Sequence, residues 1–300
     1  MDLIDLHRQH ARHLLALRRS QATVDFYWQG LLPLTRFMAA RGVEATSENV
    51  TRGLLTEFQL HLRERGLKAG GEHGILRAVR AVFRWALDEE LIDSDPTRRL
   101  RLPALPQQAP PAVQPDEVVR ALAAVKEGST PLRDKALLLT LYDTGLRASE
   151  LTQLLVEDID LVNGVIRVRA ETTKKQTSRM APLGVKAARA ITAYERRERR
   201  PALPHVQHLF LTAGGEPITR WALTHLLRQV SDRTEIPRDH LAPHAWRRGF
   251  AVQYLRNGGG LFTLQQILGH RTLAMTRRYV TYLPDDLQRD HLRASPGDRL

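Results

Sequence analysis

The stretch from His244 to Tyr279, HAWRRGFAVQYLRNGGGLFTLQQILGHRTLAMTRRY, decides the fold of the C-terminal part of this chain. Pro243, directly before it, suits the first turn of a helix, and Asn257-Gly258 suits the end of that helix. A second helix, with leucine and isoleucine at helical spacing, is expected to end at Gly269. Thr272 then suits the N-cap of a further helix that leads to Tyr279.

The same stretch carries side chains that can act on a phosphate group. His244 and Arg247 are three residues apart, so a helix places both on one face. His270 lies in the turn after the second helix, and Tyr279 follows it. Arg147 lies far upstream, in the segment TGLRASEL. Taken singly, each has an ordinary explanation: a surface pair, a capping histidine, a packed tyrosine with its hydroxyl in water.

Taken together, these residue types suit attack on a phosphodiester without a metal ion. A tyrosine hydroxyl has a pKa of about 10, so at neutral pH it needs a base or cationic surroundings to react. Tyr279 is the candidate nucleophile, and Tyr282 is its rival. Two arginines can bind the non-bridging oxygens of the transition state and stay protonated there. A lysine at a hairpin tip, for which Lys174 is the candidate, can protonate the leaving sugar oxygen.

Composition limits the class of protein. The chain has 300 residues, enough for two domains, and a formal charge of +12, which favours a polyanionic partner. Cysteine is absent, so disulfides, thiolate metal sites and a cysteine nucleophile are excluded. No apolar run is long enough to cross a bilayer, and the N-terminus carries early acids rather than a basic leader. We expect a cytoplasmic protein with no membrane partner.

The chain divides into three parts. Residues 1–100 show only helical periodicity and predict a compact helical domain. Residues 101–115 contain five prolines and almost no charge, which is typical of an extended linker. Residues 116–300 predict a second domain, mostly helical with one small sheet. Asn163-Gly164 is a strong hairpin signal there, and a short strand is expected at residues 179–183. Arg147 is expected to open a helix that runs through Leu155.

Other patterns are weaker. His7, His10 and His13 recur at three-residue spacing, but no carboxylate or thiolate accompanies them, so a metal site is not favoured. The basic run 196–200 suits a solvated helix end, with phosphate contact as the alternative. The signatures of zinc proteases, P-loop enzymes and α/β-hydrolases are missing.

The motifs resemble those of the tyrosine recombinase (phage integrase) superfamily, and the size of the chain resembles Xer-type recombinases. Members carry Thr-Gly-Leu-Arg-x-Ser-Glu-Leu, His-x-x-Arg and Leu-Gly-His, which match residues 144–151, 244–247 and 268–270 here. Their tyrosine lies nine residues after that last histidine, which selects Tyr279 over Tyr282. Their lysine lies on a β-hairpin eight residues before a proline; counting back from Pro182 selects Lys174, with Lys175 close behind.

The resemblance implies the fold and the chemistry. The fold would be mainly α with a small antiparallel sheet in the C-terminal domain, and a SAM-like helical core-binding domain and a catalytic domain would clamp duplex DNA. Tyr279 would form a 3′-phosphotyrosyl link, without metal, ATP or another cofactor. Glu150 would support the site. Arg147 and Arg247 would bind the phosphate, and His244 would assist proton transfer with the tyrosine. His270 would hydrogen-bond the phosphate, and Lys174 would protonate the leaving oxygen.

The resemblance also implies partners. Strand exchange requires a homo- or hetero-tetramer on two DNA sites, with a paralogous recombinase or a DNA translocase as further possible partners at the nucleoid. An Xer-like role in resolving chromosome dimers is favoured. The alternatives are a prophage or transposon integrase, a type IB topoisomerase that rejoins the original strand, and a non-catalytic DNA-binding regulator of the same fold.

Overall fold

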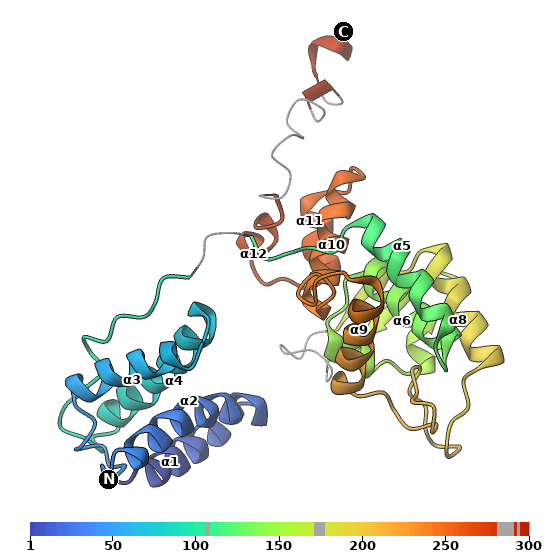
Figure 1. The fold of residues 1–300 in the computed structure, drawn as a ribbon. Coiled ribbons are helices and arrows are strands. Elements are labelled where there is room, and N and C mark those ends of the chain that lie inside the picture. The colour runs from blue at the N-terminus through green and yellow to red at the C-terminus, as the bar shows by residue number, and fades with distance from the viewer. Residues whose placement is uncertain (106–108, 171–177, 281–290, 293–294, 300) are drawn as a thin grey trace. The chain divides into compact units, whose positions relative to one another are not determined.

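The computed structural model describes residues 1–105, 109–170, 178–280, 291–292 and 295–299. The chain divides into two compact units, Met1–Gln108 and Ala109–Leu300. The architecture is mainly helical with one small antiparallel sheet in the second unit, which confirms the expected fold class (Figure 1). Among the described residues, no helix combines the length and the apolar character needed to cross a bilayer.

The described part of the first unit contains four helices packed around one core. They are α1 (Leu3–Ala16), α2 (Gln21–Ala40), α3 (Arg52–Glu64) and α4 (Ala69–Asp88). Capping side chains start two of them: Asp2 accepts hydrogen bonds from the amides of Ile4 and Asp5, and Thr51 accepts one from Leu54. The helical periodicity of this region is confirmed, because its apolar positions form the core; among them are Leu31, Leu34, Phe37, Met38, Phe58, Val79, Val82 and Phe83.

The histidines of α1 pack against aromatic rings. His10 is 4% exposed and its ring lies 4.8 Å from those of both Tyr27 and Trp85. His7 lies 4.8 Å from Trp28. Burial lowers the pKa of His10 to about 4, so this side chain is neutral at physiological pH. The three-residue spacing of these histidines therefore reflects their packing against aromatic side chains of α2 and α4.

Gly30 allows α2 and α4 to approach closely. A Cβ atom at this position would lie 2.2 Å from the Cβ of Ala78 and 3.3 Å from the carbonyl oxygen of Ile75. Gly74 is also inside a helix, α4, but a Cβ atom there would meet nothing within 4 Å. The two glycines thus differ in packing and share the same backbone conformation.

The second unit is built around α6 (Pro131–Thr144), whose residues Leu137, Leu138 and Leu141 are fully buried. In Figure 1 and by contact, this helix lies against α5 (Pro115–Ala124), α8 (Val185–Arg197) and α10 (Pro243–Arg256). The remaining α-helices with described ends in this unit are α7 (Ala148–Thr152), α9 (Arg220–Thr234), α11 (Leu261–Leu268) and α12 (Leu273–Arg277). The helices expected within residues 243–279 are confirmed, but the last, α12, ends at Arg277, two residues before Tyr279.

The sheet has three antiparallel strands in the order β1 (Ile159–Asp160), β2 (Val165–Val168) and β3 (Arg179–Pro182). Ile159 pairs with Ile166, and Val168 pairs with Arg179. Gly164 has φ +62°, the left-handed conformation that the tight turn requires. The hairpin at Asn163-Gly164 and the strand from Arg179 are therefore confirmed.

Another expected element, α7, is also shorter than predicted. The helix after Arg147 ends at Thr152 and does not run through Leu155. Leu155 instead forms an antiparallel bridge with His208, and the amide of Val156 donates to the carbonyl of Gln207. Pairing with a distant segment therefore replaces the last helical turn, which periodicity alone would extend.

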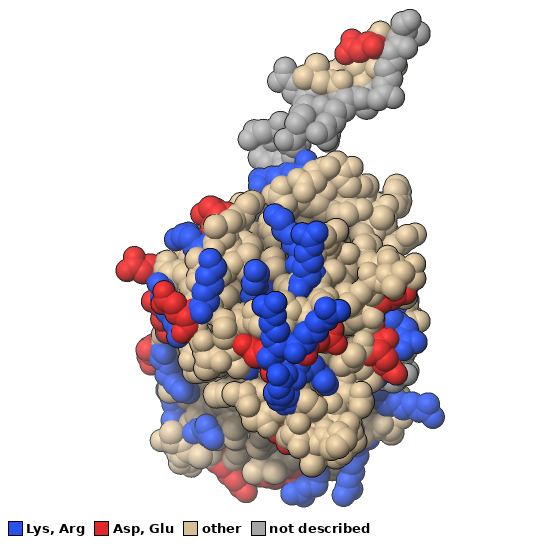
Figure 2. Space-filling model, turned by 90° about the vertical axis from the view of Figure 1, so that its right-hand side faces the viewer, with Lys and Arg blue, Asp and Glu red and all other residues tan. Residues whose placement is uncertain are grey.

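The basic run at the end of α8 has two kinds of members. Arg196, Arg197 and Arg200 are exposed, as expected for a solvated helix end. Arg199 instead donates to the carbonyl oxygens of Val206, His208 and Leu209, at 2.8–3.2 Å. Figure 2, which looks onto the side of the molecule where Figure 1 places α8, shows Lys and Arg side chains close together with Asp and Glu beside them.

We expect Gly30→Ala to destabilise the first unit by about 1–3 kcal/mol, because overpacking against Ala78 outweighs the gain of about 1 kcal/mol that alanine brings to a helix interior. Gly74→Ala is the matched control and should be stabilising by about 0.5–1 kcal/mol. Urea unfolding followed by the fluorescence of Trp28 and Trp85 measures both changes. A Gly30→Ala protein more stable than the parent would contradict the close approach of α2 and α4.

Candidate active site

Arg147 is held at the start of α7 by a carboxylate. α6 ends at Gly145, which has φ +60°, and a Cβ atom there would come within 2.3 Å of Cδ1 of Phe250. The amide of Arg147 donates to Oε2 of Glu150 at 2.8 Å, and its Nη1 donates to Oε1 at 2.7 Å. The side chain of Arg147 is 26% exposed and that of Glu150 is 0% exposed. The buried carboxylate of Glu150 therefore fixes the guanidinium of Arg147, which stays partly exposed to solvent.

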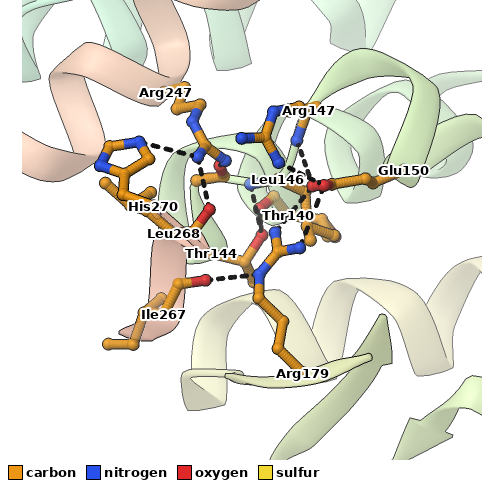
Figure 3. Close-up of polar contacts among 11 residues, drawn as sticks. Thr140, Thr144, Leu146, Arg147, Glu150, Arg179, Arg247, Ile267, Leu268 and His270 are labelled. Atoms are coloured by element: carbon orange, nitrogen blue, oxygen red, sulfur yellow. Dashed lines mark hydrogen bonds and ion pairs between the residues drawn. The ribbon is translucent and has the colours of Figure 1, made fainter. Parts of the chain in front are cut away.

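Arg247 joins the ends of two helices, α6 and α11. It lies on α10, is 5% exposed, and donates from Nη1 to the carbonyl oxygen of Gly145 and from Nη2 to that of Leu268, each at 2.6 Å. Its Nη2 also lies 3.2 Å from Nε2 of His270. Figure 3 shows the guanidinium groups of Arg147 and Arg247 next to each other above these contacts. Burial and the neighbouring Arg147 lower the pKa of Arg247 to about 10, so it remains protonated at neutral pH.

His270 and Tyr279 lie side by side. Gly269 ends α11 with φ +63°, and His270 follows it. Nδ1 of His270 is 2.9 Å from Oγ1 of Thr276, a threonine with no exposed surface. The rings of His270 and Tyr279 stack with centroids 6.0 Å apart and an angle of 24°. Tyr279 is partly exposed and packs against the apolar end of α10 and α11, so its ring is not sealed in a core.

His244 completes the set at the exposed start of α10. Partial desolvation is the main cause that lowers the pKa of His244 below its usual value of 6.5, and nearby arginines, Arg248 first among them, lower it further. The neutral imidazole is therefore the main form at neutral pH, which is the form that accepts a proton.

Two residues that sequence reasoning missed connect these parts. Arg179 donates from Nη1 and Nη2 to the two carboxylate oxygens of Glu150, at 3.0 and 2.7 Å, and from Nε to the carbonyl oxygen of Ile267 at 2.7 Å (Figure 3). The other missed residue is Thr276, whose hydroxyl is hydrogen-bonded to the ring of His270. The alternation of β3 contained a signal for the first, because Arg179 shares the inward face of the strand with buried Ala181. Thr276 lies three residues before Tyr279, and its carbonyl oxygen accepts a hydrogen bond from the amide of Tyr279 at 3.0 Å.

The charges around Glu150 are balanced by direct contacts. Burial alone would raise the pKa of Glu150, but the hydrogen bonds and charges of Arg179 and Arg147 outweigh it and hold the pKa at about 2. Gly269 makes room for this arrangement, since a Cβ atom there would lie 3.1 Å from Cδ of Arg179. Two guanidinium groups thus bind one carboxylate, a third, that of Arg247, interacts with it electrostatically, and the excess positive charge suits an anion.

The structure brings Arg147, Arg247, His270 and Tyr279 into one site, with His244 close enough for its pKa to respond to both arginines. Lys174, its alternative Lys175 and the rival tyrosine Tyr282 lie outside the described residues. Two cations, a neutral imidazole and a tyrosine hydroxyl are suited to phosphoryl transfer onto tyrosine.

Comparisons with known proteins agree with this chemistry. Residues 111–284 match the model of the Phage integrase family. The chain is 30% identical to tyrosine recombinase XerD of Halalkalibacterium halodurans over 296 residues, covering 97% of each protein. It is 32% identical to tyrosine recombinase XerC of Xanthomonas campestris pv. campestris over 268 residues, covering 89% of this chain and 81% of the relative.

Solved structures share the fold. The Tn1549 transposon integrase in complex with a circular intermediate DNA matches with a TM-score of 0.77 at 21% identity, covering 98% of this chain and 99% of the other. The XerH site-specific recombinase bound to a palindromic difH substrate matches with a TM-score of 0.69 at 19% identity, covering 94% and 81%. At these identities, the likeness concerns the fold.

We expect Thr276→Val to destabilise the second unit by about 1–3 kcal/mol, because it leaves Nδ1 of His270 without its buried partner. Thr276→Ser, which keeps the hydroxyl, should retain most of that stability. Thermal unfolding measures the loss, and the ¹⁵N shifts of the His270 ring report whether its tautomer changes. Equal stability and an unchanged ring spectrum for the valine variant would contradict a role for this hydrogen bond.

We expect His244 to titrate below pH 6.5 in anion-free buffer, measured by NMR of its ring. The imidazole is then neutral above that pKa and becomes charged as the pH falls through it. Arg248→Gln should raise the pKa of His244, because it removes a neighbouring positive charge. Arg256→Gln, at the other end of α10, is the control and should leave it unchanged. A His244 pKa above 6.5 in the parent protein would contradict this account.

Proposed function

The chain belongs to the phage integrase family, and we propose that it is a site-specific recombinase that cuts and rejoins duplex DNA through a 3′-phosphotyrosyl intermediate on Tyr279. One observation carries the proposal: the contacts of Arg247 and the stacking of His270 on Tyr279 unite residues from distant segments around a cationic, partly exposed site. The similarity to XerC and XerD over most of the chain supports an Xer-like enzyme.

The reaction begins with attack of the Tyr279 oxygen on a DNA phosphorus. The bond between tyrosine oxygen and phosphorus forms while the bond from phosphorus to the 5′-oxygen breaks, giving a 3′-phosphotyrosine and a free 5′-hydroxyl. Neutral His244 accepts the proton of the tyrosine. Lys174 donates a proton to the leaving 5′-oxygen, a role that comes from the family resemblance alone.

The arginines supply the electrostatic stabilisation. Arg147 and Arg247 donate to the non-bridging oxygens, whose negative charge grows in the transition state, and His270 adds a further hydrogen bond. Because these cations are held in place before the substrate arrives, little reorganisation is needed during the reaction. The phosphotyrosine conserves the energy of the broken bond, so a 5′-hydroxyl of another strand reverses the step without ATP.

The biological task that fits best is resolution of chromosome dimers. In this role the two units clamp duplex DNA, four protomers assemble on two recombination sites, and a paralogous recombinase or a DNA translocase takes part. The cytoplasm, at the nucleoid, is the corresponding location. The fold shared with the Tn1549 transposon integrase makes the integrase of a mobile element the second candidate.

Covalent capture on DNA tests the chemistry. Incubated with nicked suicide duplexes in EDTA and without ATP, the protein should form an SDS-resistant adduct, because the nick lets the cleaved strand diffuse away. Tyr279→Phe should abolish the adduct, since it removes the attacking oxygen, and Tyr282→Phe should retain it. Gel electrophoresis of labelled DNA measures both.

The same assay separates the rivals. Loss of the adduct only in Tyr282→Phe would move the nucleophile to that residue. DNA binding without any adduct, over many candidate sites, would favour the regulator. Relaxation of supercoiled plasmid without sequence preference would favour a topoisomerase, whereas exchange of strands between two marked sites supports the recombinase. Excision of a circular intermediate, in place of dimer resolution, would support the mobile-element role.

A further inference from the structure

We propose that Arg179 is a positioning residue for the strand-transfer reaction: it orients Glu150, and through Glu150 the phosphate-binding Arg147, and it ties β3 to the end of α11. This inference rests on the proposed function, because it assumes that Arg147 binds the scissile phosphate. The contacts of Arg179 support it, and an experiment on Arg179 tests it separately from that function.

The carboxylate of Glu150 is saturated by hydrogen bonds from two arginines. The side chain of Glu150 has no exposed surface, so solvent does not hydrate its carboxylate. Oε1 accepts from Nη1 of Arg147 at 2.7 Å and from Nη1 of Arg179 at 3.0 Å. Oε2 accepts from the amide of Arg147 at 2.8 Å and from Nη2 of Arg179 at 2.7 Å. Each oxygen thus receives one hydrogen bond from each arginine. Removal of Arg179 would take away one of the two hydrogen bonds to each oxygen.

The other edge of the Arg179 guanidinium binds the end of α11. Its Nε donates to the carbonyl oxygen of Ile267, at the end of α11. The next carbonyl, that of Leu268, accepts from Arg247, and His270 follows two residues later. Gly269 permits this approach, because a Cβ atom there would press on Arg179. One planar group therefore sets the relative places of the segments that carry Arg147 and His270, which lysine, a point charge without the fork, cannot do.

The positive charge of Arg179 helps to keep Glu150 ionised. Arg147 at the start of α7, Arg179 on β3 and Arg247 on α10 interact electrostatically with Glu150, and all three are cationic. Since burial opposes the charged form of Glu150, loss of Arg179 should raise the pKa of this carboxyl group. As the pH falls through that raised value, Glu150 becomes protonated and loses its ion pair with Arg147. A pH-dependent loss of rate follows, which a purely structural role would not produce.

The experiment measures single-turnover cleavage of suicide DNA at saturating protein from pH 5.5 to 8. The variants are Arg179→Met, Arg179→Lys, Glu150→Gln and Arg179→Met with Glu150→Gln. Arg133→Met is the matched control: the side chain of Arg133 is 14% exposed, close to the 10% of Arg179, with Nε and Nη2 on Asp134 and Nη1 on the carbonyl of Leu211, but these contacts lie apart from the site. Thermal unfolding and DNA affinity are measured for every variant.

We expect Arg179→Met to slow cleavage about 100-fold at pH 8, as misplacement of a catalytic cation does, with DNA affinity nearly unchanged. The deficit relative to the parent should grow as the pH falls. Arg179→Lys should remain slower than the parent but lose the extra pH dependence, because it keeps the charge. In the Glu150→Gln background, Arg179→Met should cost less than about threefold, since both changes break one network. Arg133→Met should cleave at the parental rate.

Three outcomes would overturn the inference: parental cleavage by Arg179→Met at every pH, a deficit that is independent of pH and multiplies with that of Glu150→Gln, or an equal deficit in Arg133→Met. If Arg179→Met does not fold, Arg179→Lys decides by the same rates, and a parental rate for it would overturn the role of the fork. Absence of any adduct with the parent protein would instead contradict the proposed function.

Discussion

The site depends on the buried guanidinium of Arg247 and its bonds to two carbonyl oxygens, those of Gly145 and Leu268. Both carbonyls lie at helix C-termini, where backbone acceptors are unpaired and the helix dipole favours a positive charge. One cation therefore holds the ends of α6 and α11 against α10. Arg147 and His270 come directly after these two ends, so their positions follow from the same contacts.

This arrangement concentrates like charges. Arg147, Arg179 and Arg247 gather around a single carboxylate, and their mutual repulsion is offset by Glu150, by three backbone carbonyls and by partial access to solvent. Together with burial, which has the larger effect on each group, the excess charge lowers the pKa of Arg247 and that of His244. A phosphate diester would relieve the repulsion. The positive charges that repel one another in the free protein are thus the charges that would bind the substrate.

The local signals in the sequence predicted much of this. Pro243 and Gly269 mark helix boundaries that the structure confirms, and Asn163-Gly164 marks the observed hairpin. These signals work because caps and tight turns depend on backbone conformations of a few adjacent residues. The same reasoning overextended α7, since the pairing of Leu155 with His208 depends on a segment far along the chain.

The sequence by itself determined the helical and strand segments, the tight turns and the residue types able to react with a phosphate, because periodicity, capping and side-chain chemistry are local properties. Only the tertiary structure decided that Arg247 reaches Gly145 across 102 positions, that Thr276 binds the ring of His270, and that Arg179 shares Glu150 with Arg147. A guanidinium can bind any carbonyl or carboxylate that packing brings near it, so its partners are set by the fold and leave little local trace.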